Sequence, residues 1–271
     1  MGKLPLILTA GEKRHKLRRL LALGLFLVAI GSLVAALLLT SHGSDLKGDS
    51  NESVASVLRI PTHSKTSTTE MARVTPTDGK KKLVALTFDD GPGPYTMRVA
   101  QVLVSKGAPA TFFLIGRQIS TRESIVNQLR ADGFELEDHT WDHVNLKALS
   151  LPNLQFEMES TAKAIGGVKY VRPPSGAFNP LVIATAHALG LKIALWNVDT
   201  LDWKDRNAAH ILARVEAGVR PGAIILMHDA GGDRSQTVAV LPQVIDWLRA
   251  HGYTLVTVDE LGAAAIRGTI K

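Results

Sequence analysis

The stretch LVALTFDDG, at residues 83–91, decides the fold because it is a short apolar run that ends directly in two acidic residues. Such an uninterrupted run is typical of a strand buried on both faces of a parallel sheet. Further apolar runs follow at 110–114, 134–137, 170–172, 192–198, 223–227 and 254–258. Amphipathic stretches lie between them, at 96–106, 122–132, 154–165, 180–189, 207–217 and 238–251. Seven strands separated by helices predict an α/β domain with a parallel sheet, either open or closed into a barrel.

The segment before this domain has a different composition. Residues 20–40 read LLALGLFLVAIGSLVAALLLT and carry no charge. As a helix they would be about 31 Å long, which matches the ~30 Å hydrocarbon core of a bilayer. The basic residues just before this run predict a cytoplasmic N-terminus by the positive-inside rule. The alternative is a cleaved signal peptide, whose apolar region is typically only about 7–15 residues and ends in small residues of A-x-A type.

Residues 41–80 contain thirteen Ser or Thr and no Phe, Trp or Tyr. Such a segment cannot bury enough apolar surface to offset the entropy of ordering it. We therefore expect four parts in the chain: a basic cytoplasmic tail at 1–19, a transmembrane signal-anchor helix at 20–40, a flexible Ser/Thr-rich linker at 41–80 and a catalytic domain at 81–271.

Charge and cysteine content exclude several classes of protein. The net charge is +6, of which residues 1–20 contribute +5 and residues 41–82 contribute +2, so the remainder sums to −1. No basic face with interleaved aromatic residues is left to bind nucleic acid, and we expect no nucleic-acid partner. The chain has no cysteine, which excludes a disulfide framework, a thiol nucleophile and a Cys-ligated metal.

Polar clusters follow the predicted strands, where ligands bind in parallel α/β folds. They are TFDDG at 87–91, HTWDH at 139–143, RPPSG at 172–176, DTLDW at 199–203 and LMHD at 226–229. His139 and His143 are four residues apart, so a helical turn would place both imidazoles on one side, about 5–6 Å apart at Cβ. Two imidazoles and one carboxylate suit a divalent transition metal with a position left open for water. The spacing lacks the Glu of the H-E-x-x-H motif, so a metalloprotease of that type is not indicated.

Together these motifs resemble the NodB-homology polysaccharide deacetylases, which are carbohydrate esterase family four. The resemblance extends over about residues 81–261. It comprises TFDDG, an ATFFLIG run at 110–116, H-x-x-x-H at 139–143, RPPxG, DxLDW and LxH at 226–228. It implies a distorted (β/α) barrel of about seven parallel strands, and hydrolysis of an N-acetyl group from a sugar amide.

The resemblance also implies roles for individual residues. Asp90, His139 and His143 would be ligands of a divalent metal, most often Zn²⁺, with Co²⁺, Ni²⁺ or Mn²⁺ as alternatives. Asp89 would be the general base that takes a proton from the attacking water, and His228 the general acid that protonates the leaving amine. Side chains of adjacent residues near a strand's end diverge, so one aspartate can bind the ion while its neighbour faces the water.

Further residues would position these groups and bind substrate. Arg172 would pair with Asp89, and Asp202 would hold His228. Four residues would form the substrate-binding groove: Ser175, Gly176, Trp203 and Leu226. Among them, the backbone N–H of Ser175 would help to stabilise the tetrahedral oxyanion, and Trp203 and Leu226 would lie beside the acetyl methyl.

The chain departs from the family pattern in two places. Ser175 stands where the family usually has Tyr, which removes an aromatic wall of the groove. Glu137 and Asp138 stand where the family commonly has Gly and a small polar residue. Asp138 would either orient an imidazole or be a solvated loop acid, and Glu137 has no explanation in the sequence. Asp229 and Arg234 lie outside the catalytic set, as a loop ion pair or as substrate contacts.

These features predict a membrane-anchored, metal-dependent deacetylase, a monomer, acting outside the cytoplasmic membrane on peptidoglycan N-acetylglucosamine or N-acetylmuramic acid. Chitin oligomers, poly-N-acetylglucosamine and O-acetylated xylan are alternative substrates. A catalytically silent glycan-binding module is an alternative from another class. A hydrolase using Ser175 as nucleophile ranks last, because no G-x-S-x-G turn surrounds that residue.

The anchor predicts a topology that fractionation can test. The full chain should require detergent for extraction, whereas a chain beginning at Lys80 should be soluble and active. Protease added to intact cells should digest residues 81–271 and spare residues 3–19. Recovery of mature protein with a new N-terminus between residues 40 and 56 would identify a cleaved signal peptide instead.

Overall fold

The computed structural model describes residues 81–266. The predicted tail at 1–19, the transmembrane helix at 20–40 and the linker at 41–80 lie outside these residues. Within residues 81–266, none of the helices combines the length and the apolar character that crossing a bilayer requires. Residues 81–266 make up the predicted catalytic domain at 81–271 except for its last five residues.

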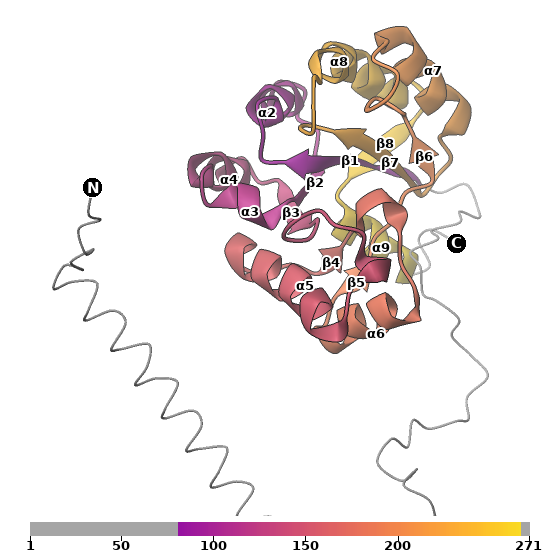
Figure 1. Cartoon of the computed structure of the whole chain (residues 1–271). Coiled ribbons are helices and arrows are strands. Elements are labelled where there is room, and N and C mark those ends of the chain that lie inside the picture. Colours follow the sequence, from indigo (N-terminus) through magenta and orange to yellow (C-terminus); the bar gives the residue numbers. More distant parts are fainter. Residues whose placement is uncertain (1–80, 267–271) are drawn as a thin grey trace, which may run out of the picture. The chain divides into compact units, whose positions relative to one another are not determined.

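A single parallel sheet forms the centre of the domain (Figure 1). Its strands, in chain order, are β1 (Lys82–Gly91), β2 (Thr111–Leu114), β3 (Glu135–Asp138), β4 (Tyr170–Val171), β5 (Lys192–Ile193), β6 (Val198–Asp199), β7 (Ala223–His228) and β8 (Tyr253–Val256). The spatial order is β5-β4-β3-β2-β1-β7-β6, and β8 pairs with the first half of β1. The sheet curls into an incomplete barrel whose edges are β5 and β6, in agreement with the predicted α/β class and parallel strands.

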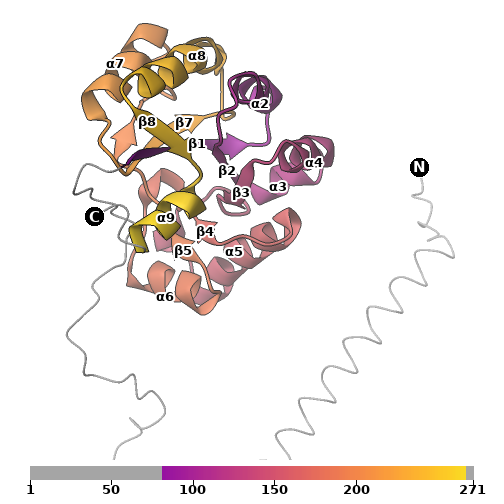
Figure 2. The same cartoon turned by 180° about the vertical axis from the view of Figure 1, so that it is seen from behind.

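Helices follow most of the strands and cover the outside of the sheet (Figures 1 and 2). They are α2 (Thr96–Ser105), α3 (Gly116–Ile119), α4 (Glu123–Ala131), α5 (Leu151–Ile165), α6 (Pro180–Ala188), α7 (Ala208–Gly218), α8 (Ser235–Ala250) and α9 (Val258–Ile266), with two short 3₁₀ turns, η1 (Leu146–Ala148) and η2 (Pro174–Gly176). Each of the six predicted helices is present, with ends within three residues of the expected ones. The sequence reading missed α3 and α9.

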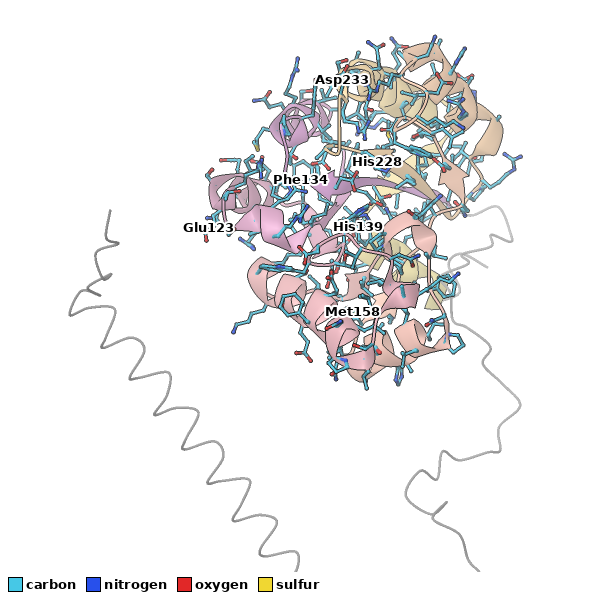
Figure 3. All side chains as sticks on the ribbon, in the orientation of Figure 1. Glu123, Phe134, His139, Met158, His228 and Asp233 are labelled. Carbon is cyan, nitrogen blue, oxygen red and sulfur yellow. The ribbon has the colours of Figure 1, made fainter. Side chains whose placement is uncertain are left out.

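The alternation of side chains along β1 separates two apolar cores. Val84, Leu86 and Phe88 belong to the main core beneath the outer helices. Leu83 and Ala85 belong to a smaller core inside the curl of the sheet, which α9 closes from one end. Figure 3 labels two further buried apolar residues, Phe134 of the main core and Met158 of a third cluster beneath α5. Because successive strand residues face opposite sides, Thr87 and Asp89 continue the inward face and make it polar at its carboxyl end.

The predicted strand at 192–198 is in fact two short strands on opposite edges of the sheet. β5 pairs with β4, whereas β6 pairs with β7. The residues between them cross from one edge to the other. Asn197 fixes this crossing, since its side-chain oxygen accepts the Ile224 N–H at 2.9 Å and its own N–H donates to the Ile224 carbonyl at 3.2 Å. An apolar run in the sequence does not reveal which neighbour each half will pair with.

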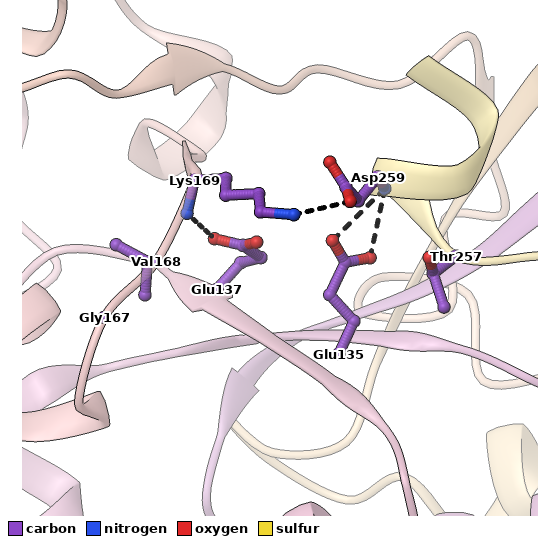
Figure 4. Close-up of a pocket in the computed structure, with 7 residues that line it drawn as sticks. All are labelled: Glu135, Glu137, Gly167, Val168, Lys169, Thr257 and Asp259. Atoms are coloured by element: carbon purple, nitrogen blue, oxygen red, sulfur yellow. Dashed lines mark hydrogen bonds and ion pairs between the residues drawn. The ribbon is translucent and has the colours of Figure 1, made fainter. Parts of the chain in front are cut away.

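Glu137 has a structural role at the amino end of the sheet. β3 and β4 share only one register pair, Asp138 with Val171. The Glu137 carboxylate extends this junction by accepting the backbone N–H groups of Lys169 at 2.9 Å and Tyr170 at 2.8 Å. It lies in a pocket of about 420 Å³ whose other charged groups are also engaged (Figure 4).

In that pocket, Glu135 accepts the N–H groups of Val258 at 2.8 Å and Asp259 at 3.1 Å, at the N-terminus of α9. Lys169 Nζ lies 2.6 Å from Asp259. The pocket therefore joins β3, β4 and α9, at the end of the sheet opposite to the predicted catalytic residues.

Replacing Glu137 should alter stability in a pH-dependent way. Burial raises the pKa of Glu137 to about 8, against the two backbone hydrogen bonds, which lower it. A carboxyl with a raised pKa binds a proton more tightly in the folded state, so its contribution is complete below about pH 4.5 and declines as the pH rises toward 8. Glu137→Gln keeps an acceptor and cannot ionise. Its free energy of unfolding should therefore fall less than that of the parent between pH 5 and 8, as urea titrations at each pH will measure.

Two further variants complete the comparison. Glu137→Ala leaves both N–H groups without their acceptor and should cost about 1–3 kcal/mol near pH 5, with the cost decreasing as the pH rises toward 8. Glu159→Gln, which changes an exposed acid on α5, should follow the parent. Parallel pH dependence in the parent and Glu137→Gln would contradict the assignment.

Candidate active site

A β-bulge at the end of β1 brings both aspartates to one side of the sheet. Asp89 pairs with Phe113 and Gly91 with Leu114, so Asp90 is an extra residue between two consecutive register pairs. Its φ of 74° lies in the left-handed region. A regular strand would send the two side chains to opposite faces, and the sequence predicted such a divergence. That prediction was wrong, because the bulge turns both carboxylates toward the same imidazole: His139 Nε2 lies 3.7 Å from Asp89 Oδ2 and 3.6 Å from Asp90 Oδ1.

The three predicted metal ligands converge. Asp90 Oδ1 lies 3.6 Å from His139 Nε2 and 3.4 Å from His143 Nε2, and all three donor atoms lie within 4.8 Å of one another. Ligand atoms on a tetrahedral zinc ion are roughly 3.3 Å apart, given metal–ligand bonds of about 2.0–2.2 Å. Two imidazole nitrogens and one carboxylate oxygen at these separations fit a divalent transition metal.

The surroundings of His139 favour metal binding by its Nε2 atom. His139 is buried, and its Nδ1 lies 2.8 Å from the Arg172 carbonyl, so the ring donates there and leaves the Nε2 lone pair for an ion. Burial lowers the pKa of His139, despite the opposing charges of Asp89 and Asp90. The ring is therefore neutral at neutral pH, the form that binds metal.

The two histidines meet through a loop and not through a helical turn. Residues 139–145 are irregular, and Thr140 and His143 have φ values of 67° and 57°. The imidazole centroids are nevertheless 4.9 Å apart. The predicted proximity of the rings is confirmed, whereas the predicted helical geometry is wrong.

Arg172 is fully buried and fixes Asp89. Its Nη1 donates to Asp89 Oδ1 at 2.6 Å and to Thr87 Oγ1 at 2.8 Å. The guanidinium lies 3.8 Å from the ring centroid of Phe113, a favourable cation–π contact. A bidentate or stacked guanidinium leaves little freedom to the carboxylate that it binds.

Asp202 and Thr237 hold His228 on the other side of β1. Asp89 and His228 are register partners on the adjacent strands β1 and β7. Asp202 accepts the Nδ1–H of His228 through Oδ1 at 2.7 Å, and its Oδ2 accepts the His228 backbone N–H at 2.9 Å and the Thr237 hydroxyl at 2.8 Å. Because Nδ1 donates to Asp202, the proton that His228 could transfer is the one on Nε2.

This network raises the pKa of His228. Burial by itself would lower that pKa, but the hydrogen bond and the charge of Asp202 outweigh burial, and Asp89 and Asp90 add to the rise. The pKa of Asp202 is lowered for the reciprocal reason, because its contacts with His228 and Thr237 outweigh the effect of burial. The contact therefore favours an imidazolium beside a carboxylate, up to a higher pH than for an ordinary histidine.

The four predicted groove residues differ in their placement. Ser175 is exposed and adopts the left-handed conformation with φ 55° within η2. Gly176 covers Trp196, which a Cβ at this position would approach to 3.1 Å. Leu226 is buried on β7, and Trp203 is 48% exposed on the loop that carries Asp202. No hydrogen bond or ion pair ties these side chains to the metal ligands within residues 81–266, so their roles remain predictions.

Three residues that the sequence left outside the catalytic set have surroundings that differ from those expected. Asp138 is fully buried, its Oδ1 accepts the Thr140 N–H at 2.5 Å, and its Oδ2 has no partner in residues 81–266. It is therefore not a solvated acid, and the imidazole of His139 donates to a carbonyl instead of to it. Asp229 and Arg234 form no ion pair with each other. Asp229 accepts the Thr96 hydroxyl, and Arg234 donates to backbone carbonyls.

Two positioning residues were missed by the sequence analysis. Thr87 was quoted only as part of TFDDG, although strand alternation places it on the same face as Asp89. Thr237 carries no signal in the sequence, since it lies on α8 and reaches Asp202 only through the packing of that helix.

Comparisons with known proteins agree with this geometry. A family model described as polysaccharide deacetylase matches residues 77–194. The peptidoglycan-N-acetylglucosamine deacetylase of Bacillus cereus is 37% identical over 190 residues, which are 67% of this chain and 88% of that relative. A chitooligosaccharide deacetylase of Azorhizobium caulinodans is 33% identical over 190 residues, 64% of this chain and 90% of the relative.

A solved structure shares the fold as well. Peptidoglycan deacetylase PdaC from Bacillus subtilis superimposes with a TM-score of 0.65 at 31% identity, covering 71% of this chain and 96% of its own. The chain therefore belongs to the polysaccharide deacetylase family, hydrolases that act on the N-acetyl amide bonds of glycans.

Proposed function

We propose that this protein removes N-acetyl groups from peptidoglycan, using a divalent metal ion, Zn²⁺ in the first instance, held by Asp90, His139 and His143. The observation that carries the proposal is the pairing of Asp89 and His228 across β1 and β7, with the ligand set beside Asp89. An amide needs an activated water on one side and a proton donor for its nitrogen on the other. These two residues stand where a base and an acid are required.

The chain's own residues divide the work. Asp89 takes a proton from the attacking water, and Arg172 holds its carboxylate in position. His228 gives the proton from Nε2 to the leaving amine, while Asp202 holds the ring in position. Bound to the three ligands, a divalent ion would polarise the acetyl carbonyl and lower the pKa of the water. The Ser175 backbone N–H would stabilise the oxyanion, and Gly176, Trp203 and Leu226 would border the acetyl group.

Peptidoglycan is the proposed substrate for two reasons. The relative from Bacillus cereus and the structure from Bacillus subtilis are both named for it. The predicted anchor at 20–40 and linker at 41–80 would place the domain beside the cell wall. Neither reason comes from the geometry of the site, which would suit any N-acetylated glycan.

Acetate release from purified substrates tests the proposal. The full chain should release acetate from peptidoglycan faster than from chitin oligomers, poly-N-acetylglucosamine or acetylxylan. A chelator should stop this release, and zinc added back should restore it. Release from chitin oligomers alone would reassign the substrate. Absence of release from all four would refute the proposed function.

The two adjacent aspartates should respond differently to amide substitution. Asp90→Asn removes a ligand and should lower zinc affinity, with part of the activity restored by excess zinc. Asp89→Asn removes the base and should bind zinc about as well as the parent, while activity falls by about 10²–10⁴-fold without rescue. Metal content of the purified variants, measured beside their activity, separates the two roles.

Folding must be checked in the same samples. Asp89→Asn leaves the buried Arg172 without its counter-charge and should lower the melting temperature. A folded Asp89→Asn protein that has lost its zinc, together with an Asp90→Asn protein that keeps it, would reverse the assignment.

The activity should fall at alkaline pH where His228 loses its proton. Asp202 raises the pKa of His228 against the effect of burial, so the protonated acid persists to a higher pH than for an ordinary histidine. In Asp202→Asn the charge is gone while burial remains, and the alkaline limb of the kcat profile should move to lower pH. Asp205→Asn provides the matched control, because Asp205 is an acid of the same loop that pairs with Arg214 and His210 instead. An alkaline limb unmoved by Asp202→Asn would exclude His228 as the acid.

A further inference from the structure

Two arginines converge on an exposed glycine beside the metal ligands. Gly232 lies on the loop that follows His228 and has a φ of 145°. A Cβ at this position would lie 3.6 Å from Arg234 Nη1 and 3.7 Å from Arg206 Nη2. Arg206 belongs to the loop that carries Asp202, so the two cations reach the same point from the two loops that bear the predicted acid and its partner. Figure 3 labels His228 and Asp233, which lie on either side of Gly232 in the chain.

Arg234 is a buried cation that forms no ion pair with a carboxylate within residues 81–266. It is only 3% exposed, and its three hydrogen bonds go to the backbone carbonyls of Ala230, Asp233 and Gly231, at 2.7, 3.2 and 3.1 Å. A guanidinium has five N–H donors, so two remain. Buried charges are ordinarily paired, because leaving one without a counter-charge is costly.

The nearby acids are engaged elsewhere. Asp205, next to Arg206 in the chain, binds Arg214 and His210. Asp233 accepts the Tyr95 hydroxyl at 2.7 Å and the Ser235 N–H at 2.9 Å. The charge of Arg206 helps to lower the pKa of Asp233, so the Asp233 carboxylate offsets part of the Arg206 charge. The two side chains nevertheless form no ion pair.

The cations lie next to the predicted metal ligands. A Cβ on Gly231 would collide with the Asp90 carboxylate, and Arg234 Nη2 would lie 3.5 Å from the same Cβ. Gly231 and Gly232 have no side chains that could stand over the two arginines, of which Arg206 is exposed and Arg234 is buried. A group bound here would lie beside the sugar whose acetyl group is at Asp90.

We propose that Arg206 and Arg234 form an anion subsite that binds a carboxylate of the glycan, on a sugar next to the one that is deacetylated. Guanidinium groups match carboxylates in geometry and charge. This inference rests on the proposed peptidoglycan substrate, in which alternate sugars carry a lactyl ether that ends in a carboxylate or in a peptide. Neutral glycans such as chitin offer no group for this site.

A matched pair of substrates isolates the subsite. The first is a tetrasaccharide of alternating N-acetylglucosamine and N-acetylmuramic acid with free lactyl carboxylates, and the second is the same tetrasaccharide with these groups amidated. The full-length, zinc-loaded protein should prefer the first, mainly through KM, and added salt should reduce the preference. In Arg206→Gln the ratio of the two kcat/KM values should fall roughly five- to twentyfold, and it should fall further in Arg206→Glu.

Arg206 is exposed, so its replacement should leave the fold intact, which melting temperatures will check. Lys204→Gln removes another exposed cation of the same loop and should keep the parent's preference. Equal preference in the parent and Arg206→Gln, an equal loss in Lys204→Gln, or a parent that does not distinguish the two tetrasaccharides would each overturn the subsite while leaving the deacetylase intact. A parent that releases acetate from chitotetraose and from neither tetrasaccharide would refute the peptidoglycan proposal, and the subsite with it.

Discussion

The buried Arg172 is the residue on which the rest of the site depends. Its guanidinium binds the base Asp89, and its backbone carbonyl accepts the proton of His139 Nδ1. The same guanidinium donates to the carbonyls of Ala194 at 3.3 Å and Leu195 at 3.5 Å, in the segment that crosses from β5 to β6. Taking this charge out of water is expensive, and only a complete set of partners offsets the cost. One residue, through its side chain and its backbone carbonyl, thus couples the closure of the curled sheet to the orientation of a base and a ligand.

Much of this could be predicted from the sequence, for a physical reason. Apolar runs that alternate with amphipathic stretches determine a parallel α/β fold, and the carboxyl ends of parallel strands lie at one end of the sheet. The clusters containing Asp90, His139 and His228 therefore had to meet. What could not be predicted depends on backbone detail: the bulge at Asp90, the irregular loop that joins the two histidines and the division of 192–198 between two edges. None of these follows from residue type or spacing.

The bulge explains how two identical side chains take different surroundings. Asp89 remains in register on the inward face of β1, where Thr87 and Arg172 engage it. Asp90 is the extra residue, so it is free of the ladder and turns toward His139 and His143. Regular strand geometry would have placed one carboxylate in the main apolar core, where an unpaired charge is unfavourable. The positive φ of Asp90 is the local cost of avoiding this, and such strain is typical of functional sites.

The loops that carry Asp90 and His228 are also locked to each other. A Cβ on Gly91 would come within 2.5 Å of Asp229, and one on Gly93 would collide with Ala230. Thr96 joins the two loops, since its hydroxyl accepts the Gly93 N–H at 2.7 Å and donates to the Asp229 carboxyl. Burial raises the pKa of Asp229 to about 7, so this group can lie close to Asp90 without a full second charge. Because neither loop can shift alone, the distance between a metal ligand and the proton donor is set by backbone packing, which is the preorganisation that proton transfer to an amide nitrogen requires.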